Sequence, residues 1–107
     1  LMPATISENG IHKLEVQSQA DGLAGSEMAV YYLHKYTGET QKGDVQPGVP
    51  SGDTVTFYTD LKDAGVTPGD WRWELVREAG GVKRGVTVEG VKGRGGSVRV
   101  LDTKAIS

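Results

Sequence analysis

The residues of this 107-residue chain that could do chemistry are few, and the densest group is a glycine-rich basic segment. Residues 80–96 (GGVKRGVTVEGVKGRGG) hold seven of the sixteen glycines together with four basic side chains. Free backbone amides beside cations could bind an anion such as phosphate. However, the segment lacks the Gly-Lys-Ser/Thr ending of a P-loop, and no helix pattern follows it. Two hairpins explain it better, with Arg84, Lys92 and Arg94 as candidate contacts to a partner.

Groups for acid–base or nucleophilic catalysis form no recognisable set. His12 and His34 belong to different predicted strands, no Gly-x-Ser-x-Gly sequence occurs, and there is no cysteine. We expect His34 to be a partly buried histidine that is satisfied by a neighbour. Carboxylate pairs of the glycosidase kind could be drawn from residues 60–74, but acids are common at the loop ends of any sandwich. We therefore predict that the protein is not an enzyme.

Three aspartates flank one predicted corner and could offer oxygen ligands to calcium: Asp60, Asp63 and Asp70. Their spacing is not that of an EF-hand, and aspartate is a common capping and turn residue. A thiolate site is excluded because the chain has no cysteine. We predict neither a metal nor another cofactor.

Aromatic residues raise the alternative of carbohydrate binding. Trp71 and Trp73 lie two residues apart and therefore share one face of a strand, where they could stack on a sugar. Leu75 shares that face while charged residues alternate with it, so we expect the tryptophans in the core. The four tyrosines cannot all be buried, and Tyr36 is our candidate for an exposed aromatic that contacts a partner.

Alternating hydrophobicity is the main signal for the elements that must position these residues. Runs of β-forming residues predict strands at 28–36, 53–61 and 71–77, and shorter strands at 11–17, 86–89 and 98–101. In the second run we expect Val55, Phe57 and Leu61 to be buried, and Thr54, Thr56, Tyr58 and Asp60 to face solvent.

Clusters of glycine, proline and aspartate separate these runs every 8 to 12 residues or so, which is typical of a β-sandwich or barrel. Residues 60–64 are predicted to form at most a helical turn. Residues 38–52 are predicted to be either a long loop or a short edge strand that changes sheets. We predict an all-β protein with one domain over residues 1–107, in which 1–10 and 102–107 could be extended arms.

Charge is unevenly distributed along the chain. Residues 1–71 carry four basic and ten acidic side chains, whereas residues 72–107 carry eight and four, and the net charge is −2. We expect most of these charges to pair across strands. Nucleic acid is disfavoured as a partner because the aromatics lie away from the basic segment. The first residues lack the pattern of a signal peptide and no stretch reaches about 20 apolar residues, so we expect a soluble protein without a membrane partner.

The sequence LKDAGVTPGDWRWELV at residues 61–76 resembles the corner between the fifth and sixth strands of immunoglobulin-like and fibronectin type III-like modules. Trp71 stands where those modules usually have tyrosine, and the Cys…Trp…Cys core of antibody domains is absent. The resemblance implies a single immunoglobulin-like antiparallel β-sandwich of about seven strands. In style the chain is similar to small modules of phage virions, among them head decoration and tail proteins.

This resemblance implies a non-catalytic structural module that docks on a protein assembly, with a virion surface as the expected location. Its partners would be capsid or tail proteins, and self-association is a second kind of contact to consider. Binding of a carbohydrate or another ligand, as a module of a surface protein, is the alternative.

Overall fold

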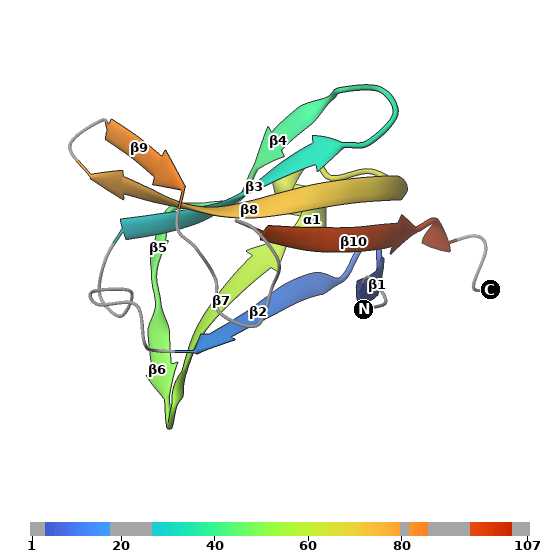
Figure 1. Cartoon of the computed structure of the whole chain (residues 1–107). Coiled ribbons are helices and arrows are strands. Elements are labelled where there is room, and N and C mark those ends of the chain that lie inside the picture. The colour runs from blue at the N-terminus through green and yellow to red at the C-terminus, as the bar shows by residue number, and fades with distance from the viewer. Residues whose placement is uncertain (1–3, 18–26, 80–81, 86–94, 104–107) are drawn as a thin grey trace.

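The computed structural model describes residues 4–17, 27–79, 82–85 and 95–103, and within them the chain is an all-β protein built from two packed sheets (Figure 1). The elements in chain order are β1 (Ala4–Ser7), β2 (Ile11–Gln17), β3 (Glu27–His34), β4 (Thr40–Lys42), β5 (Gln46–Pro47), β6 (Val49–Ser51), β7 (Thr54–Asp60), α1 (Leu61–Ala64), β8 (Gly69–Ala79), β9 (Val82–Gly85) and β10 (Gly95–Leu101). The predicted all-β class is confirmed.

The larger sheet has the strand order β1-β10-β8-β3-β4, with β5 also paired to β3 and β9 also paired to β8. The smaller sheet has the order β2-β7-β6. Pairing is antiparallel except between β1 and β10, which run parallel. The two sheets lie one above the other in Figure 1, with β8 and β3 in the middle of the large sheet and β7 in the middle of the small one.

Alternating side chains from both sheets fill the space between the layers, as expected for a β-sandwich. The buried core comprises Leu14, Val16, Met28, Val30, Tyr32, Val55, Phe57, Leu61, Val66, Trp71, Trp73, Leu75, Val98 and Val100. Trp71 is fully buried, and its indole N–H donates to the backbone oxygen of Thr67 at 2.7 Å. The prediction that the tryptophan face belongs to the core is confirmed.

One expectation about β7 is wrong. Thr56 was expected to face solvent, yet only 4% of it is exposed. β7 is the central strand of the small sheet, and Thr56 lies between Glu15 of β2 and Val49 of β6. Neighbours on both sides therefore cover this short side chain, whereas the longer Tyr58 on the same face stays 49% exposed.

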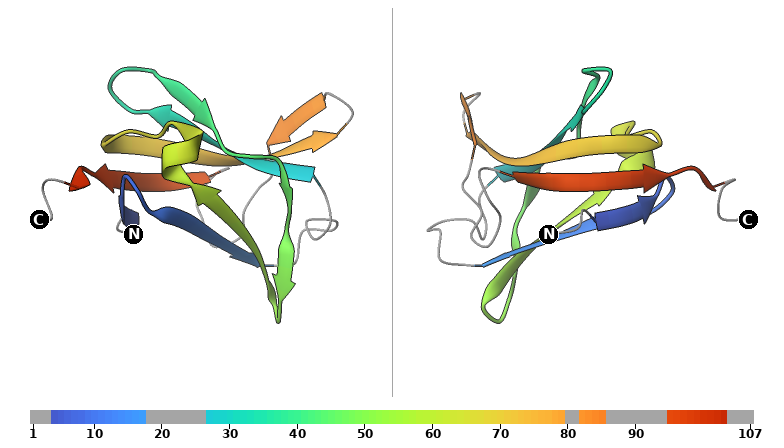
Figure 2. Two further views of the ribbon diagram at one scale, coloured as in Figure 1. Left: turned by 180° about the vertical axis from the view of Figure 1, so that it is seen from behind. Right: turned by 45° about the vertical axis from the view of Figure 1, so that its right-hand side comes forward.

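The segment between β3 and β7 passes from one sheet to the other, so the second of the two predictions for residues 38–52 is confirmed. β4 and β5 pair with β3 in the large sheet, and β6 pairs with β7 in the small one. Figure 2 shows this run from behind as one path down the side of the molecule. The side-chain amide of Gln46 closes the gap: it donates to the backbone oxygen of Tyr58 at 2.6 Å and accepts from its N–H at 2.9 Å.

The corner after β7 is a single helical turn, as predicted. The carboxylate of Asp60 caps it by accepting from the N–H groups of Lys62 and Asp63 at 3.1 and 3.2 Å. The turn ends at Gly65, whose φ of 79° suits glycine. Asp60 thus has the capping role that the sequence favoured over calcium binding.

Both ends of the described chain belong to the large sheet. Residues 1–10 were considered as an arm, but β1 is a paired strand in this sheet. Glu8 then holds the other end, because its carboxylate accepts from the backbone and the hydroxyl of Thr103 at 3.2 and 2.8 Å. The strand predicted at 86–89 lies outside the described residues, as does the end of the second predicted arm.

Candidate binding surface

The four residues predicted to face a partner do not form one described cluster. Tyr36 lies in the turn between β3 and β4, whereas Arg84 lies in β9, where its backbone pairs with that of Arg77. These positions are at opposite ends of the β3–β8 pair, which is registered from Met28 opposite Arg77 to His34 opposite Trp71. Lys92 and Arg94 lie outside the described residues.

His34 builds the turn that carries Tyr36. Its Nδ1 accepts hydrogen bonds from the backbone N–H groups of Tyr36 and Thr37 at 3.2 and 3.1 Å. The His34 ring also packs edge-on against Trp71, with 4.9 Å between ring centroids, and against Tyr36 at 6.2 Å. The predicted role of a partly buried, satisfied histidine is confirmed, and Nδ1 must be the unprotonated nitrogen.

Glycines and backbone bonds complete this hairpin tip, which we define as residues 35–39. Gly38 has a φ of 75°, and the N–H of Lys35 donates to the backbone oxygen of Asp70 at 2.9 Å. Gly69 lies under the histidine, where an added Cβ would come within 2.6 Å of the Nε2 of His34. The tip is therefore tied to the start of β8, and it presents Tyr36 with 80% of the residue exposed.

An ion pair supports the base of the tip. The guanidinium of Arg99 on β10 donates to the carboxylate of Asp70 at 2.9 Å. This hydrogen bond is the main reason why the pKa of Asp70 is lowered and that of Arg99 is raised. Asp70 is thus the partner of an arginine, and the outer surface beside Tyr36 is polar and charged.

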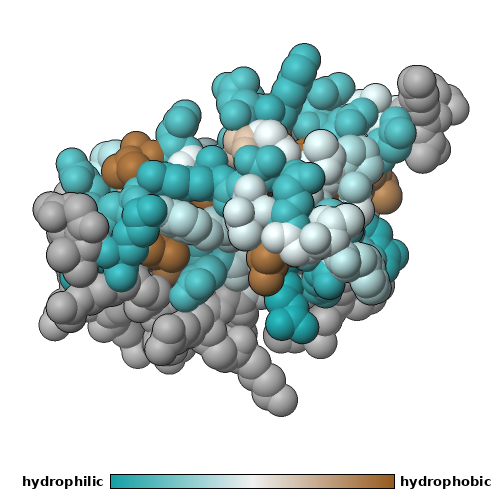
Figure 3. All heavy atoms as spheres, turned by 90° about the horizontal axis from the view of Figure 1, so that it is seen from above, coloured by the Kyte–Doolittle hydropathy of each residue, from teal (hydrophilic) through white to brown (hydrophobic). Residues whose placement is uncertain are grey.

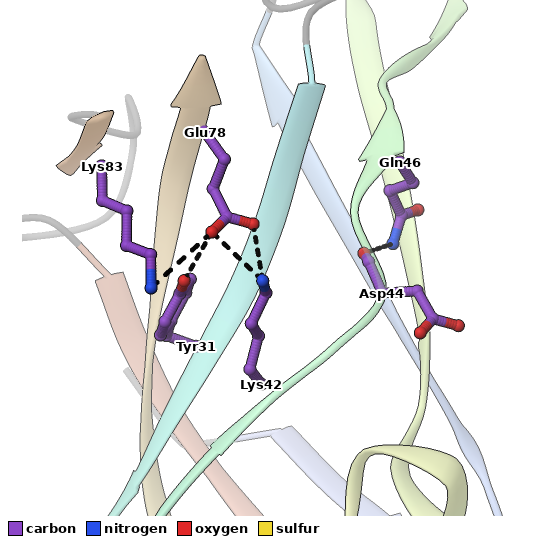
Figure 4. A network of polar contacts seen from close by, with 6 residues as sticks. All are labelled: Tyr31, Lys42, Asp44, Gln46, Glu78 and Lys83. Atoms are coloured by element: carbon purple, nitrogen blue, oxygen red, sulfur yellow. Dashed lines mark hydrogen bonds and ion pairs between the residues drawn. The ribbon is translucent and has the colours of Figure 1, made fainter. Parts of the chain in front are cut away.

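A second cluster, which we call the lysine cluster, consists of Tyr31, Lys42, Glu78 and Lys83 (Figure 4). Glu78 accepts from the Tyr31 hydroxyl at 2.8 Å and pairs with the ammonium groups of Lys42 and Lys83 at 2.9 and 3.9 Å. Hydrogen bonds from Lys42 first, and then from Tyr31, lower the pKa of Glu78. Two lysines against one glutamate give this cluster one net positive charge.

Lys42 and Lys83 are not among the residues that the sequence predicts to contact a partner. They are 41 residues apart in sequence, and only the pairing of β4 with β3 and of β9 with β8 brings them to Tyr31. Their ammonium groups lie 5.7 and 5.4 Å from the centre of the Tyr31 ring. Lys83 belongs to the basic segment 80–96, but nothing in the sequence places Lys42 beside it.

An open hollow of about 770 Å³ lies between the tip and the lysine cluster. Its lining includes Leu33, Lys35, Thr40, Arg72, Glu74 and Ser97. The hollow exists because short side chains flank the longer ones of the central strands: Thr40 pairs with Leu33, and Ser97 pairs with Arg72. Figure 3 shows this upper face as mainly hydrophilic, with separated hydrophobic patches.

The described aromatics do not form a platform for a sugar. Trp71 and Trp73 are 0% and 7% exposed, and Tyr32 is buried as well. The ammonium groups of Lys42 and Lys83 lie beside the Tyr31 ring, where a sugar would have to stack. Tyr36 and Tyr58 are the most exposed aromatics among the described residues, but they belong to different sheets.

His12, the other histidine, is part of the core. It is 4% exposed, and its Nδ1 lies 2.7 Å from the hydroxyl of Tyr32, which bridges the two sheets. Burial lowers the pKa of His12 to about 4 and raises that of Tyr32. Both side chains are therefore neutral near pH 7, and their position gives them a structural role.

The residues that the structure describes contain no group of three or more His, Asp or Glu side chains placed to hold a metal. None of their helices is long and apolar enough to cross a membrane. Comparison of the chain with protein-family models, curated proteins and solved structures gives no match.

Proposed function

We propose that this protein is a non-catalytic binding module that docks on a larger protein assembly through the hairpin tip. The assembly that we expect is the surface of a phage virion, where the module would decorate the capsid or belong to the tail. We propose a virion because the sequence resembles small virion modules. We propose docking because the hairpin tip exposes Tyr36 on its surface.

The observation that carries the docking proposal is the exposure of Tyr36 on a fixed turn. An aromatic ring that is 80% exposed contributes little to the fold, yet four hydrogen bonds or ring contacts through His34 hold the turn that presents it. Tyrosines of this kind supply large contact areas at low entropic cost, because the backbone is ordered before binding. Tyr36 is thus suited to anchor a partner.

Positive charge supplies the second contact in this proposal. Lys42 and Lys83 are exposed on the outer face of the large sheet, toward the end of the β3–β8 pair that lies away from the tip. The sequence adds Arg84, Lys92 and Arg94 in or after β9. These charges favour an acidic surface on the partner, since complementary charge speeds association and fixes orientation.

We further propose that the sandwich is immunoglobulin-like. The small sheet β2-β7-β6 corresponds in chain order to strands B, E and D, and β10-β8-β3-β4 corresponds to G, F, C and C′. The helical turn α1 occupies the E-to-F corner, where the resemblance in sequence was seen. Trp71 replaces the usual tyrosine there, and a backbone oxygen four residues earlier accepts its indole N–H.

Co-sedimentation with assembled particles tests the docking proposal. The particles would be phage capsids or tails assembled without this protein. We expect Tyr36→Ala to abolish co-sedimentation and Tyr36→Phe to retain it. Tyr58→Ala is the matched control, because this tyrosine is also exposed but lies on the small sheet. Equal binding by all three variants would refute the role of the tip.

The charged contact is tested separately. Lys83→Glu combined with Lys92→Glu and Arg94→Glu should weaken co-sedimentation, and the loss should shrink as salt is added. Unchanged binding would remove the basic surface from the proposal.

Ligand binding in the hollow is the second candidate. It is favoured by Arg72 and Glu74, which line the hollow and have no ion-pair partner among the described residues. Polar ligands such as carbohydrates use such groups for orientation. Binding on a glycan array that is lost in Arg72→Ala but kept in Tyr36→Ala would favour this candidate over docking through the tip.

A further inference from the structure

β2 is the longest strand at the edge of either sheet in the described part of the chain. All seven of its residues pair with β7, from Ile11 opposite Asp60 to Gln17 opposite Thr54. On its other side, no backbone hydrogen bond reaches any described residue. An edge of this kind presents a row of N–H and C=O groups that another strand can pair with.

Three of the other described edges are protected in the usual ways. β4, β5 and β6 have only two or three residues each, and β5 and β6 contain Pro47 and Pro50, which cannot donate a backbone hydrogen bond. The Gln46 amide also covers the backbone of Tyr58 beside β6. β2 contains neither proline nor glycine. Its length, and an edge that pairs with no described residue, therefore set it apart.

The charges on β2 are arranged so that the strand complements itself. The side chains of Lys13 and Glu15 are both 52% exposed and pair with each other at 3.2 Å within one chain, so a contact between two β2 strands would exchange this pair in each copy for two pairs between copies. They lie on the outer face together with Ile11, half of which is exposed. In an antiparallel pair of two β2 strands centred on Leu14, Lys13 of each copy faces Glu15 of the other. The same register pairs all seven residues and keeps the buried face of both strands on one side.

Neighbouring registers are unfavourable. A pair centred on Lys13 would place the two lysines opposite each other. A pair centred on Glu15 would place the two glutamates opposite each other. In both registers like charges repel. A shift by a single residue in the pairing would turn the core-facing side chains of one strand to the outside. Lysine on an edge strand usually discourages pairing, but the glutamate two residues later makes one register attractive.

We propose that two copies of this chain form a two-fold symmetric dimer by pairing β2 with β2, registered on Leu14. The two small sheets, each of three strands, then become one continuous sheet across the two-fold axis. The outer face of the large sheet and the tip with Tyr36 take no part in this contact. The proposal therefore stands independently of the docking function.

Sedimentation-equilibrium analysis of the full chain tests the proposal. We expect a reversible monomer–dimer equilibrium. Lys13→Glu should weaken the dimer about tenfold or more, because both attractive pairs become repulsive. Glu15→Lys should do the same. Lys62→Glu, an equal charge change on the exposed face of α1, should have no effect.

Charge exchange makes the test specific to the register. The double variant Lys13→Glu/Glu15→Lys should dimerise like the unaltered chain, and the two single variants should form a heterodimer when they are mixed. Circular dichroism would confirm that each variant is folded, as expected for half-exposed positions. A chain that stays monomeric would overturn the proposal. A dimer that Lys13→Glu and Lys62→Glu weaken equally would also overturn it. The same holds if the two single variants form no heterodimer when they are mixed.

Discussion

His12 shows how a single residue can make the stability of this protein depend on pH. Folding removes it from water and places its Nδ1 against the Tyr32 hydroxyl, with the Trp73 ring 6.0 Å away. The protein can hold this imidazole in its neutral form at little cost. Protonation would put a positive charge into the core between the sheets, where there is no room to solvate it.

The lowered pKa of His12 predicts acid destabilisation well above the range of the carboxylates. The pKa falls from 6.5 to about 4 on folding, so the unfolded state binds the extra proton between these values. The contribution of His12 to the free energy of unfolding should therefore be complete above about pH 6.5 and fall by about 3 kcal/mol as the pH drops to 4. Urea denaturation across this range would measure it. A His12→Gln variant should lose this slope, and an unchanged slope would contradict the role of His12.

We predict that Trp71 is needed for stability, whereas Tyr36 is needed for binding and not for stability. Trp71→Ala removes a fully buried ring and its hydrogen bond, and should cost about 3 to 5 kcal/mol in the free energy of unfolding. Tyr36→Ala should change that free energy by no more than about 0.5 kcal/mol, because the side chain is exposed. Chemical denaturation of both variants checks the contrast. A large loss of stability in Tyr36→Ala would mean that the residue is held for structural reasons.

At the scale of elements, the hairpin tip depends on the missing side chain at position 69. Gly69 has a φ of 141°, and a Cβ there would collide with His34. Gly69→Ala should therefore displace the imidazole, destabilise the protein by about 1 to 3 kcal/mol and loosen the turn. Gly38→Ala is the matched control: its φ is also positive, but a Cβ would meet nothing within 4 Å.

Hydrogen exchange distinguishes these two glycine variants. The amides of Tyr36 and Thr37, which donate to His34, should exchange faster in Gly69→Ala than in Gly38→Ala. Equal protection in the two variants would show that His34 does not order the tip.

The elements themselves could largely be predicted, because alternation in β2, β7 and β8 follows directly from a buried and an exposed face. The sequence also predicted correctly that Trp71 and Trp73 are buried and that a turn follows Asp60. The position of β1 could not be predicted, since four residues beside β10 carry no distinctive pattern. The lysine cluster also depends on registers between distant strands, and these are set by the whole core.

At the scale of the whole molecule, the two oppositely charged parts of the sequence meet in the large sheet. Asp70 pairs with Arg99, and Lys42 pairs with Glu78, so each pair joins a residue of the acidic part to one of the basic part. The expected cross-strand pairing thus accounts for several charges. Among the described residues, Lys83 has only a 3.9 Å ion pair and Arg72 has none, and the sequence adds Lys92 and Arg94 after β9.

The central claim is that the tip bearing Tyr36 contacts the assembly on which this module docks. The most direct measurement is photo-crosslinking within assembled particles, with a photoreactive phenylalanine analogue placed at position 36 or, as a control, at position 58. The account predicts a covalent product with a structural protein of the particle from position 36 and none from position 58. Crosslinking from position 58 alone, or from neither position in particles that contain the module, would contradict it.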